Sequence, residues 1–181
     1  MIAPLLALAL AARAPAAAAP PPDEKWKAVT ARLLKRIPKI VWQTNGLLVG
    51  DVNGDRHPDV VALGTDHDNV VLAVVLAPVT LASKPLLITF RPPAGPHPDP
   101  GAVCGAPAEV AIGFEPPGVK PTELACAAKK ITPECREVLA TELRLQTARE
   151  HGARGIRMGG GKCLPLHIYF DRGRFRWWRN D

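Results

Sequence analysis

The chain contains a single serine, few aromatic residues and no apolar run long enough to cross a bilayer. Ser83 lies in an Ala-Ser-Lys context rather than in the G-x-S-x-G turn of a nucleophile elbow, which argues strongly against a serine hydrolase. No two cysteines show the C-x₂₋₄-C spacing of a structural zinc site. No segment repeats along the chain, whereas a complete β-propeller needs several similar blades.

The first residues have the pattern of an export signal. Leu5 to Ala12 form a short apolar core, and Ala16 to Ala18 supply the small residues that precede a cleavage site. An apolar core of about eight residues is too short to span a bilayer, which needs roughly 20. We therefore predict a signal peptide over residues 1–19, a periplasmic or extracellular location, and no membrane span.

The remaining residues, 23–181, are predicted to form one β-rich domain. A hydrophobic content of 47% is sufficient for a core, and 20 prolines favour long irregular connections, of which the richest in Pro and Gly is residues 91–105. The formal net charge of +6 permits contact with acidic polymers. We attribute this charge mainly to solubility and expect no nucleic acid partner.

The four cysteines all lie beyond the predicted signal peptide. An even count in an oxidising compartment predicts two disulfides, for which three pairings are open. We favour the local pair Cys126–Cys135, together with Cys104–Cys163, which would tie a middle strand to the C-terminal hairpin.

Two segments have the signals of helices. The three- and four-residue spacing of an apolar stripe predicts a helix over residues 23–37: Trp26, Val29, Leu33 and Ile37. The second helix is predicted to begin after Thr132, a good N-cap followed by Pro133, and to end at Gly152.

Short apolar runs with β-branched residues, separated by polar turns, predict antiparallel strands. The runs cover residues 47–49, 60–63, 70–76, 84–90, 108–114, 155–158, 164–170 and 174–178. Asp59–Leu63 and Val70–Leu76 are expected to form the tightest hairpin. The predicted fold class is thus α+β and β-rich: an antiparallel meander or small sheet with an N-terminal helix and one helix before the C-terminal hairpin.

The acidic loop between two of these runs is the most specific motif in the sequence. Residues 47–63 place oxygen side chains at positions 1, 3, 5 and 9 of the loop: Asp51, Asn53, Asp55 and Asp59. Ca²⁺ takes six to eight oxygen ligands, and the carbonyl of His57 could supply position 7. The alternative is a turn whose Asp and Asn side chains accept hydrogen bonds from their own backbone.

The loop resembles the calcium loop of FG-GAP repeats (integrin α-subunit-like, also called VCBS), present in a single copy. The matching residues are Gly50-Asp51-Val52-Asn53-Gly54-Asp55 and Pro58-Asp59. The resemblance implies a β-sheet environment and a Ca²⁺ ligand set of Asp51, Asn53, Asp55, the His57 carbonyl and Asp59. The family usually has Gly where this chain has Arg56, which would be strained by about 1 kcal/mol and would weaken calcium binding.

The C-terminal hairpin is similar to that of small exported bacterial proteins of unknown function that carry one such loop. Its last strand directs Phe175 and Trp177 to one face and three other residues to the opposite face: Arg174, Arg176 and Trp178. These three residues could form an interaction face for an acidic partner. The alternative is an edge strand whose charges prevent aggregation.

The sequence therefore predicts an exported, monomeric, non-catalytic protein with one structural calcium loop and a binding role toward a protein or envelope polymer. A periplasmic inhibitor or envelope-interaction protein that uses the basic C-terminal face is a second hypothesis. A third is a hydrolase that depends on carboxylates outside the calcium loop, for which Asp66 and Asp68 are candidates.

Overall fold

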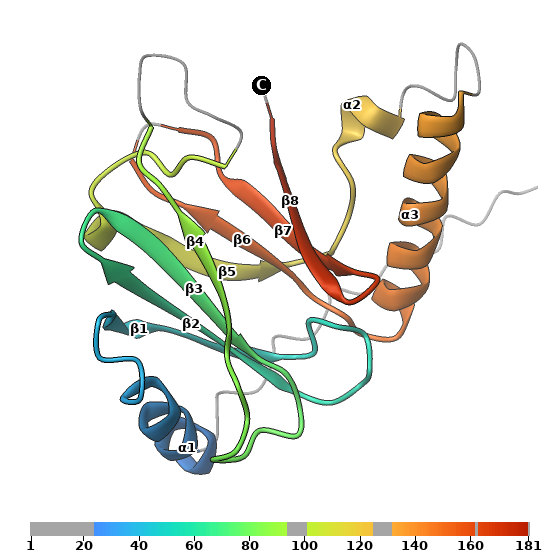
Figure 1. Cartoon of the computed structure of the whole chain (residues 1–181). Helices are drawn as coiled ribbons and strands as arrows, with labels where there is room; N and C mark the ends of the chain where they lie inside the picture. Colours follow the sequence, from blue (N-terminus) through green and yellow to red (C-terminus); the bar gives the residue numbers. More distant parts are fainter. Residues whose placement is uncertain (1–23, 94–100, 125–131, 162, 181) are drawn as a thin grey trace, which may run out of the picture.

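The computed structural model describes residues 24–93, 101–124, 132–161 and 163–180 (Figure 1). The predicted signal peptide, residues 94–100 of the Pro-rich loop, and Cys126 lie outside the described residues. The helices and strands are α1 (Glu24–Leu34), β1 (Val41–Gly50), β2 (Asp59–Asp66), β3 (Asn69–Val75), β4 (Leu86–Phe90), the 3₁₀ turn η1 (Pro107–Glu109), β5 (Ala111–Glu115), α2 (Pro121–Leu124), α3 (Pro133–Glu150), β6 (Gly155–Gly159), β7 (Leu166–Asp171) and β8 (Arg174–Arg179).

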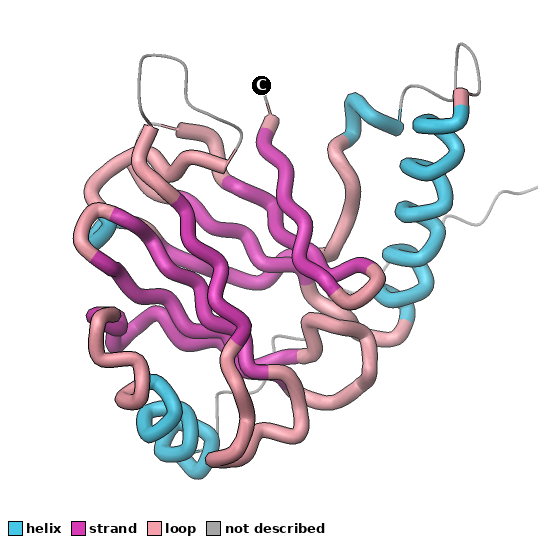
Figure 2. The backbone as a smooth tube through the Cα atoms, in the orientation of Figure 1, coloured by secondary structure: helices cyan, strands magenta, loops and turns pink. Residues whose placement is uncertain are grey.

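The strands form two four-stranded antiparallel sheets, ordered β1-β2-β3-β4 and β5-β6-β7-β8 (Figure 2). Each sheet is a meander in which neighbours in sequence are neighbours in space. The predicted hairpin is formed by β2 and β3, which pair without interruption from Val60 opposite Val75 to Asp66 opposite Asn69. The α+β, β-rich fold class is confirmed, whereas the division of the strands into two sheets was not predicted.

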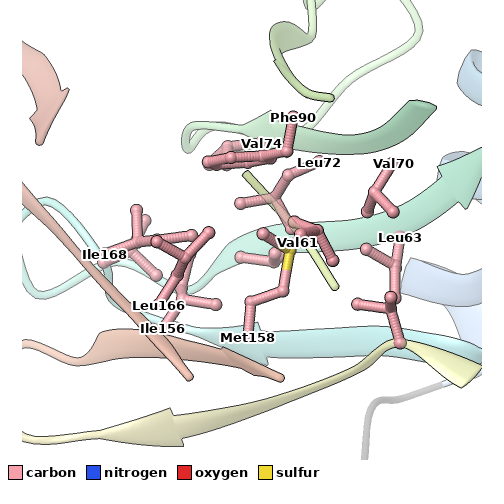
Figure 3. Close-up of a cluster of buried hydrophobic side chains, with 13 residues drawn as sticks. Val61, Leu63, Val70, Leu72, Val74, Phe90, Ile156, Met158, Leu166 and Ile168 are labelled. Atoms are coloured by element: carbon pink, nitrogen blue, oxygen red, sulfur yellow. The ribbon is translucent and has the colours of Figure 1, made fainter. Parts of the chain in front are cut away.

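The two sheets share one apolar core (Figure 3). Leu63 and Leu72 of the first sheet and Ile156 and Ile168 of the second are at most 1% exposed. Met158 of β6 lies among the same side chains. Because alternate residues of a strand point to opposite faces, this core uses one face of each sheet.

The opposite face of the first sheet is covered by α1. Leu33 packs against Val60 and Val75, and Leu34 packs against Ala62 and Ala73. Both faces of β2 and β3 are therefore buried, which explains why residues 60–63 of β2 and 70–75 of β3 are apolar without interruption.

The outer face of the second sheet is partly covered by α3. Leu145 of α3 packs against Tyr169 of β7 and against Val119. The predicted N-cap is present, since the Thr132 hydroxyl accepts a hydrogen bond from the Cys135 backbone N–H at 3.2 Å. Among the described residues, no helix combines the length and the apolar content needed to cross a membrane.

One predicted disulfide lies wholly within the described residues. Cys104 and Cys163 are bonded, with 5.4 Å between their Cα atoms, a separation that suits a disulfide. The bond ties the segment before β5 to the segment before β7. Cys135 is also disulfide-bonded, and its predicted partner is the undescribed Cys126.

The short helix α2 was not predicted, and the largest differences from the predicted boundaries are in α1 and β1. Helix α1 ends at Leu34, and the Ile37 N–H closes a final turn on the Leu34 carbonyl. Strand β1 begins at Val41, six residues before the predicted start at residue 47. Its pairing with β2 shifts between Trp42 and Leu47, and the polar residues of this irregularity concealed the first half of the strand.

The shared core predicts a large cost for truncating Leu72, which is fully buried. The substitution Leu72→Ala should lower the free energy of unfolding by about 2–5 kcal/mol, because it removes buried methyl groups and leaves a cavity. Leu86→Ala on the neighbouring strand β4 is the matched control, since Leu86 is 43% exposed. Urea unfolding of both variants measures the difference, and equal losses would contradict the position of the core.

Candidate functional site

The acidic loop, residues 51–58 with Asp59 at the start of β2, joins the first two strands at one end of the sandwich (Figure 1). The Asp51 carbonyl accepts a hydrogen bond from the Arg154 backbone N–H at 2.7 Å, just before β6. The Val52 side chain is 3% exposed and belongs to the core between the sheets. The loop therefore contacts both sheets and holds their edges together.

Asp51 organises the first half of the loop. One of its carboxylate oxygens accepts a hydrogen bond from the Gly54 N–H and the other from the Arg56 N–H, both at 2.7 Å. The backbone curls around this carboxylate, as expected for position 1 of either a calcium loop or an Asx turn. Each oxygen has two lone pairs, so one lone pair on each remains for a further partner.

Asn53 and Asp55 form a second, more exposed group. The Asn53 amide donates to the Asp55 carboxylate at 2.9 Å, and the Asn53 side-chain oxygen accepts from the Asp55 N–H at 3.0 Å. The other Asp55 oxygen accepts from the His57 N–H at 2.8 Å. The structure thus brings Asn53 and Asp55 into direct contact and places His57 in the exposed part of the loop.

Asp59 is fully buried and ties the loop to the sheet. One oxygen accepts from the Val52 N–H at 2.9 Å and the other from the Ala77 N–H at 2.8 Å. Burial raises the pKa of this carboxyl, and the charges of Asp55 and Asp51 add to the rise, although the two backbone donors oppose it. Asp59 therefore joins the loop to the segment after β3. A cation near the loop would stabilise its ionised form against burial and against the charges of Asp55 and Asp51.

The predicted side-chain ligands accept hydrogen bonds from backbone N–H groups of the loop or of neighbouring residues. Across the described ranges, no group of three His, Cys, Asp or Glu side chains is arranged to hold a metal ion. Asp51, Asn53 and Asp55 fit a hard cation by their oxygen chemistry and exposure. Asp59 fits less well, since both its oxygens are directed at backbone donors in the interior.

Arg56 has a backbone φ of 68°, in the left-handed region that favours glycine. Gly54, two residues earlier, has a φ of 81°. Arg56 therefore has a glycine-like conformation, held by the hydrogen bond from its N–H to Asp51.

The proposed basic face is partly occupied by contacts within the chain. The Trp178 ring stacks on His167, with 4.0 Å between ring centroids, and its indole N–H donates to the Gly118 carbonyl at 2.8 Å. Arg176 lies 3.8 Å from Asp171, whereas Arg174 is exposed. Of the three predicted residues, Arg174 is the one most accessible to a partner.

A His–Glu pair on the outer face of the second sheet was not predicted. The His167 Nδ1 lies 2.9 and 3.0 Å from the two carboxylate oxygens of Glu115, and its buried Nε2 has no hydrogen-bond partner among the described residues. Strand alternation could have placed both residues on an outer face, but their contact depends on the order β5-β6-β7, which the sequence does not reveal.

The third hypothesis concerned Asp66 and Asp68, which flank the turn between β2 and β3. The Asp66 carboxylate lies 2.8 Å from the ring of His67, whose side chain is 90% exposed. Neither aspartate lines a described cavity with a second carboxylate. The hydrolase hypothesis gains no support from this arrangement.

A scan of protein-family models finds no match to this chain, and searches of curated proteins and of solved structures find none either. The function is therefore argued from the residues and their geometry.

The left-handed conformation of Arg56 predicts a stabilising substitution. Arg56→Gly should raise the free energy of unfolding by about 0.5–1 kcal/mol, because glycine adopts this φ without steric cost. Arg56→Ala is the control, since it removes the charge but keeps the Cβ atom. Urea unfolding should show a gain for glycine alone, and an equal gain for alanine would assign the effect to charge.

The ion pair between α3 and the β7–β8 turn predicts a pH dependence. Arg144 donates to both oxygens of Asp171, at 2.9 and 3.2 Å. Burial raises the pKa of Asp171, but the hydrogen bond and charge of Arg144, with the charges of Arg172 and Arg176, outweigh burial and hold the pKa below its ordinary value of 3.8. A carboxyl whose pKa is lower in the folded than in the unfolded chain stabilises the fold at pH values above its unfolded pKa. This contribution is lost as the pH falls through the folded pKa.

Arg144→Ala should therefore lower the free energy of unfolding by about 1–2 kcal/mol at pH 7, allowing for the partial exposure of Arg144. The difference in the free energy of unfolding between wild type and variant should become smaller below pH 3.8 as Asp171 becomes protonated. Arg136→Ala, on an exposed position of the same helix, should show no such change. A difference in the free energy of unfolding that stays constant from pH 7 to pH 3 would refute the role of this ion pair.

Proposed function

We propose that this chain is an exported, non-catalytic binding protein in which the acidic loop is a calcium-dependent clamp between the two sheets. The observation that carries the proposal is the curl of the loop around Asp51. Its carboxylate accepts from the Gly54 and Arg56 N–H groups, and Arg56 keeps the glycine-like φ of 68°. A calcium loop needs this backbone path before an ion can be bound.

The charges of the loop also favour a cation. Asp51, Asp55 and Asp59 lie within one short segment, and burial raises the pKa of Asp59, with the charges of Asp55 and Asp51 adding to the rise. A bound Ca²⁺ would neutralise this repulsion and take oxygens from Asp51, Asn53 and Asp55, with the His57 carbonyl as a further ligand. The exposure of Asp55 and His57 leaves room for water to complete the shell.

The role of the ion would be structural rather than chemical. Val52 belongs to the shared core and the Asp51 carbonyl is bonded to Arg154, so a stiffer loop stabilises the contact between the sheets. The bond between Cys104 and Cys163 suits an oxidising compartment, which supports export. The partner would be a protein or envelope polymer bound by the monomer, with Arg174 as the accessible basic residue.

Thermal melting in Ca²⁺ and in chelator tests the clamp. A site with a Kd of about 1 mM, typical of weak extracellular sites, gains about 1.4 kcal/mol at about 10 mM Ca²⁺. A domain of this size should then melt about 3–6 °C higher. The same concentration of Mg²⁺ should have little effect, since Mg²⁺ gives up its water reluctantly.

Two matched variants locate the ion. Asp55→Asn keeps an acceptor for the His57 N–H but removes a charge, so it should abolish most of the calcium-induced shift. Asp68→Asn removes an exposed carboxylate at the β2–β3 turn and should leave the shift unchanged. Identical melting of the wild type in Ca²⁺ and chelator would refute the proposal.

A further inference from the structure

Strand β4 forms one edge of the first sheet, and no described strand pairs with its outer side (Figure 1). Directly after β4, the Arg91 carbonyl accepts a hydrogen bond at 2.9 Å from the N–H of Val103, which lies outside β3, so this carbonyl is directed away from β3. Because alternate residues of a strand direct their backbone groups to the same side, the N–H and C=O groups of Leu87 and Thr89 also point outward. Within the described ranges, none of these groups has a hydrogen-bond partner.

Three large apolar side chains at this edge are only partly buried. Leu86 and Leu87 are 43% and 45% exposed, although they lie on opposite faces of β4. Trp177 of β8 is 43% exposed, and its ring contacts Phe90 edge-on, with 5.6 Å between the ring centroids. A strand added outside β4 would therefore cover apolar side chains as well as pair with the backbone.

Strand β4 lacks the charges that usually protect an edge strand. Proteins prevent association between sheet edges by placing charged side chains within the edge strand. Strand β8, the edge of the second sheet on the same side, carries Arg174, Arg176 and Arg179, whereas the five residues of β4 carry no charge. The edge of β4 is therefore open to pairing with another strand.

The charge at the two ends of β4 is positive. Lys84 lies shortly before the strand and Arg91 directly after it. Both side chains are exposed, and neither has an ion-pair partner in the part of the chain that the structure describes. Residues 79–93 contain no Asp or Glu, and neither do residues 172–180 of the neighbouring edge. An incoming strand with acidic residues at both ends would meet a cation at each end.

We propose that the outer edge of β4 binds an extended, acidic segment of a partner protein as a fifth strand of the first sheet. Hydrogen bonds to the backbone of Leu87 and Thr89 supply the affinity, and apolar side chains at alternate positions of the segment pack on the exposed leucines of β4. Lys84 and Arg91 select a segment with acidic ends. This inference rests on the proposed binding role, whose partner it specifies, but not on the calcium clamp.

A second copy of this chain fits the edge less well than an acidic segment does. An antiparallel pair of β4 strands would bring Lys84 and Arg91 of the two copies close together at both ends of the pair. Like charges that face one another across paired strands are destabilising. Charge complementarity therefore favours a different, acidic protein as the partner.

Fluorescence anisotropy with a labelled peptide tests the site on the purified, disulfide-intact chain. The probe is a peptide of alternating Thr and Val with two Glu at each end, and the same peptide with Lys in place of Glu is its control. The acidic peptide should bind saturably and the basic peptide about fivefold more weakly or not at all. Lys84→Glu should weaken binding of the acidic peptide by about fivefold, the effect of one exposed ion pair. Lys39→Glu, which reverses an exposed charge outside this edge, is the matched control and should leave the affinity unchanged.

Two substitutions of Thr89 test whether the backbone of β4 makes the contact. Thr89→Pro removes the outward N–H, which an edge strand tolerates, so it should weaken peptide binding by about tenfold while the protein stays folded. Thr89→Ala keeps the N–H and should bind as the wild type does. Amide hydrogen exchange gives a second measurement: the peptide should protect the amides of Leu87 and Thr89, whereas the Ile88 amide, directed at β3, should not change.

Three outcomes would overturn the proposal. The first is the absence of saturable binding by a folded wild-type chain at up to about 1 mM acidic peptide. The second is equal binding by Thr89→Pro and Thr89→Ala, or equal weakening by Lys84→Glu and Lys39→Glu, which would assign the effect to diffuse charge. The third is a concentration-dependent dimer that Thr89→Pro dissociates, which would show that a second copy of the chain covers the edge.

The β4 site and the calcium clamp can fail independently. Peptide binding should be the same in Ca²⁺ and in chelator, because the edge of β4 does not include the acidic loop. Absence of peptide binding with an intact calcium-induced melting shift would refute the β4 site alone. Intact peptide binding without that shift would refute the clamp alone.

Discussion

The burial of both faces of β2 and β3 is the constraint on which the rest of the architecture depends. Residues 60–63 of β2 and 70–75 of β3 are apolar without interruption, so neither face of these two strands can be left in water. One face is covered by the second sheet, which supplies Ile156, Met158 and Ile168 to the shared core. The other face is covered by α1 through Leu33 and Leu34. The layer order of helix, sheet and sheet follows from these two strands.

The acidic loop takes its importance from the same constraint. The loop lies at one end of the two packed sheets. There the Val52 side chain packs into the core, and the Asp51 carbonyl accepts a hydrogen bond from the Arg154 backbone N–H. Asp59 holds this arrangement from inside, because its two oxygens accept from Val52 and from Ala77 beyond the end of β3. A buried carboxylate is costly, but here it satisfies two backbone donors that would otherwise be unpaired. The loop is thus part of the packing of the sandwich.

The sequence predicted what local patterns determine. Apolar runs with β-branched residues and the polar turn between them located the β2–β3 hairpin, and Thr132 located the start of α3. The positions of Asp51, Asn53 and Asp55 predicted a turn around their side chains, and both interpretations of that turn share the observed geometry. The spacing alone cannot distinguish a turn satisfied by backbone donors from one that also holds an ion.

Features that depend on the packing of distant segments were not predictable. The first half of β1 contains polar residues, and it is recognisable as a strand only through its pairing with β2. Glu115 and His167 meet because β6 lies between β5 and β7, a strand order that no local signal contains.

Arg56 carries a local cost in its left-handed backbone, but His67 and Arg172 adopt the same kind of conformation in other turns. A positive φ is therefore not by itself an indication of a binding site. The difference at Arg56 is that its N–H donates to the Asp51 carboxylate, within a loop whose charges raise the pKa of the buried Asp59 in addition to burial. The strain at Arg56 thus maintains the backbone path around Asp51, and a cation would hold this path in place without removing the strain.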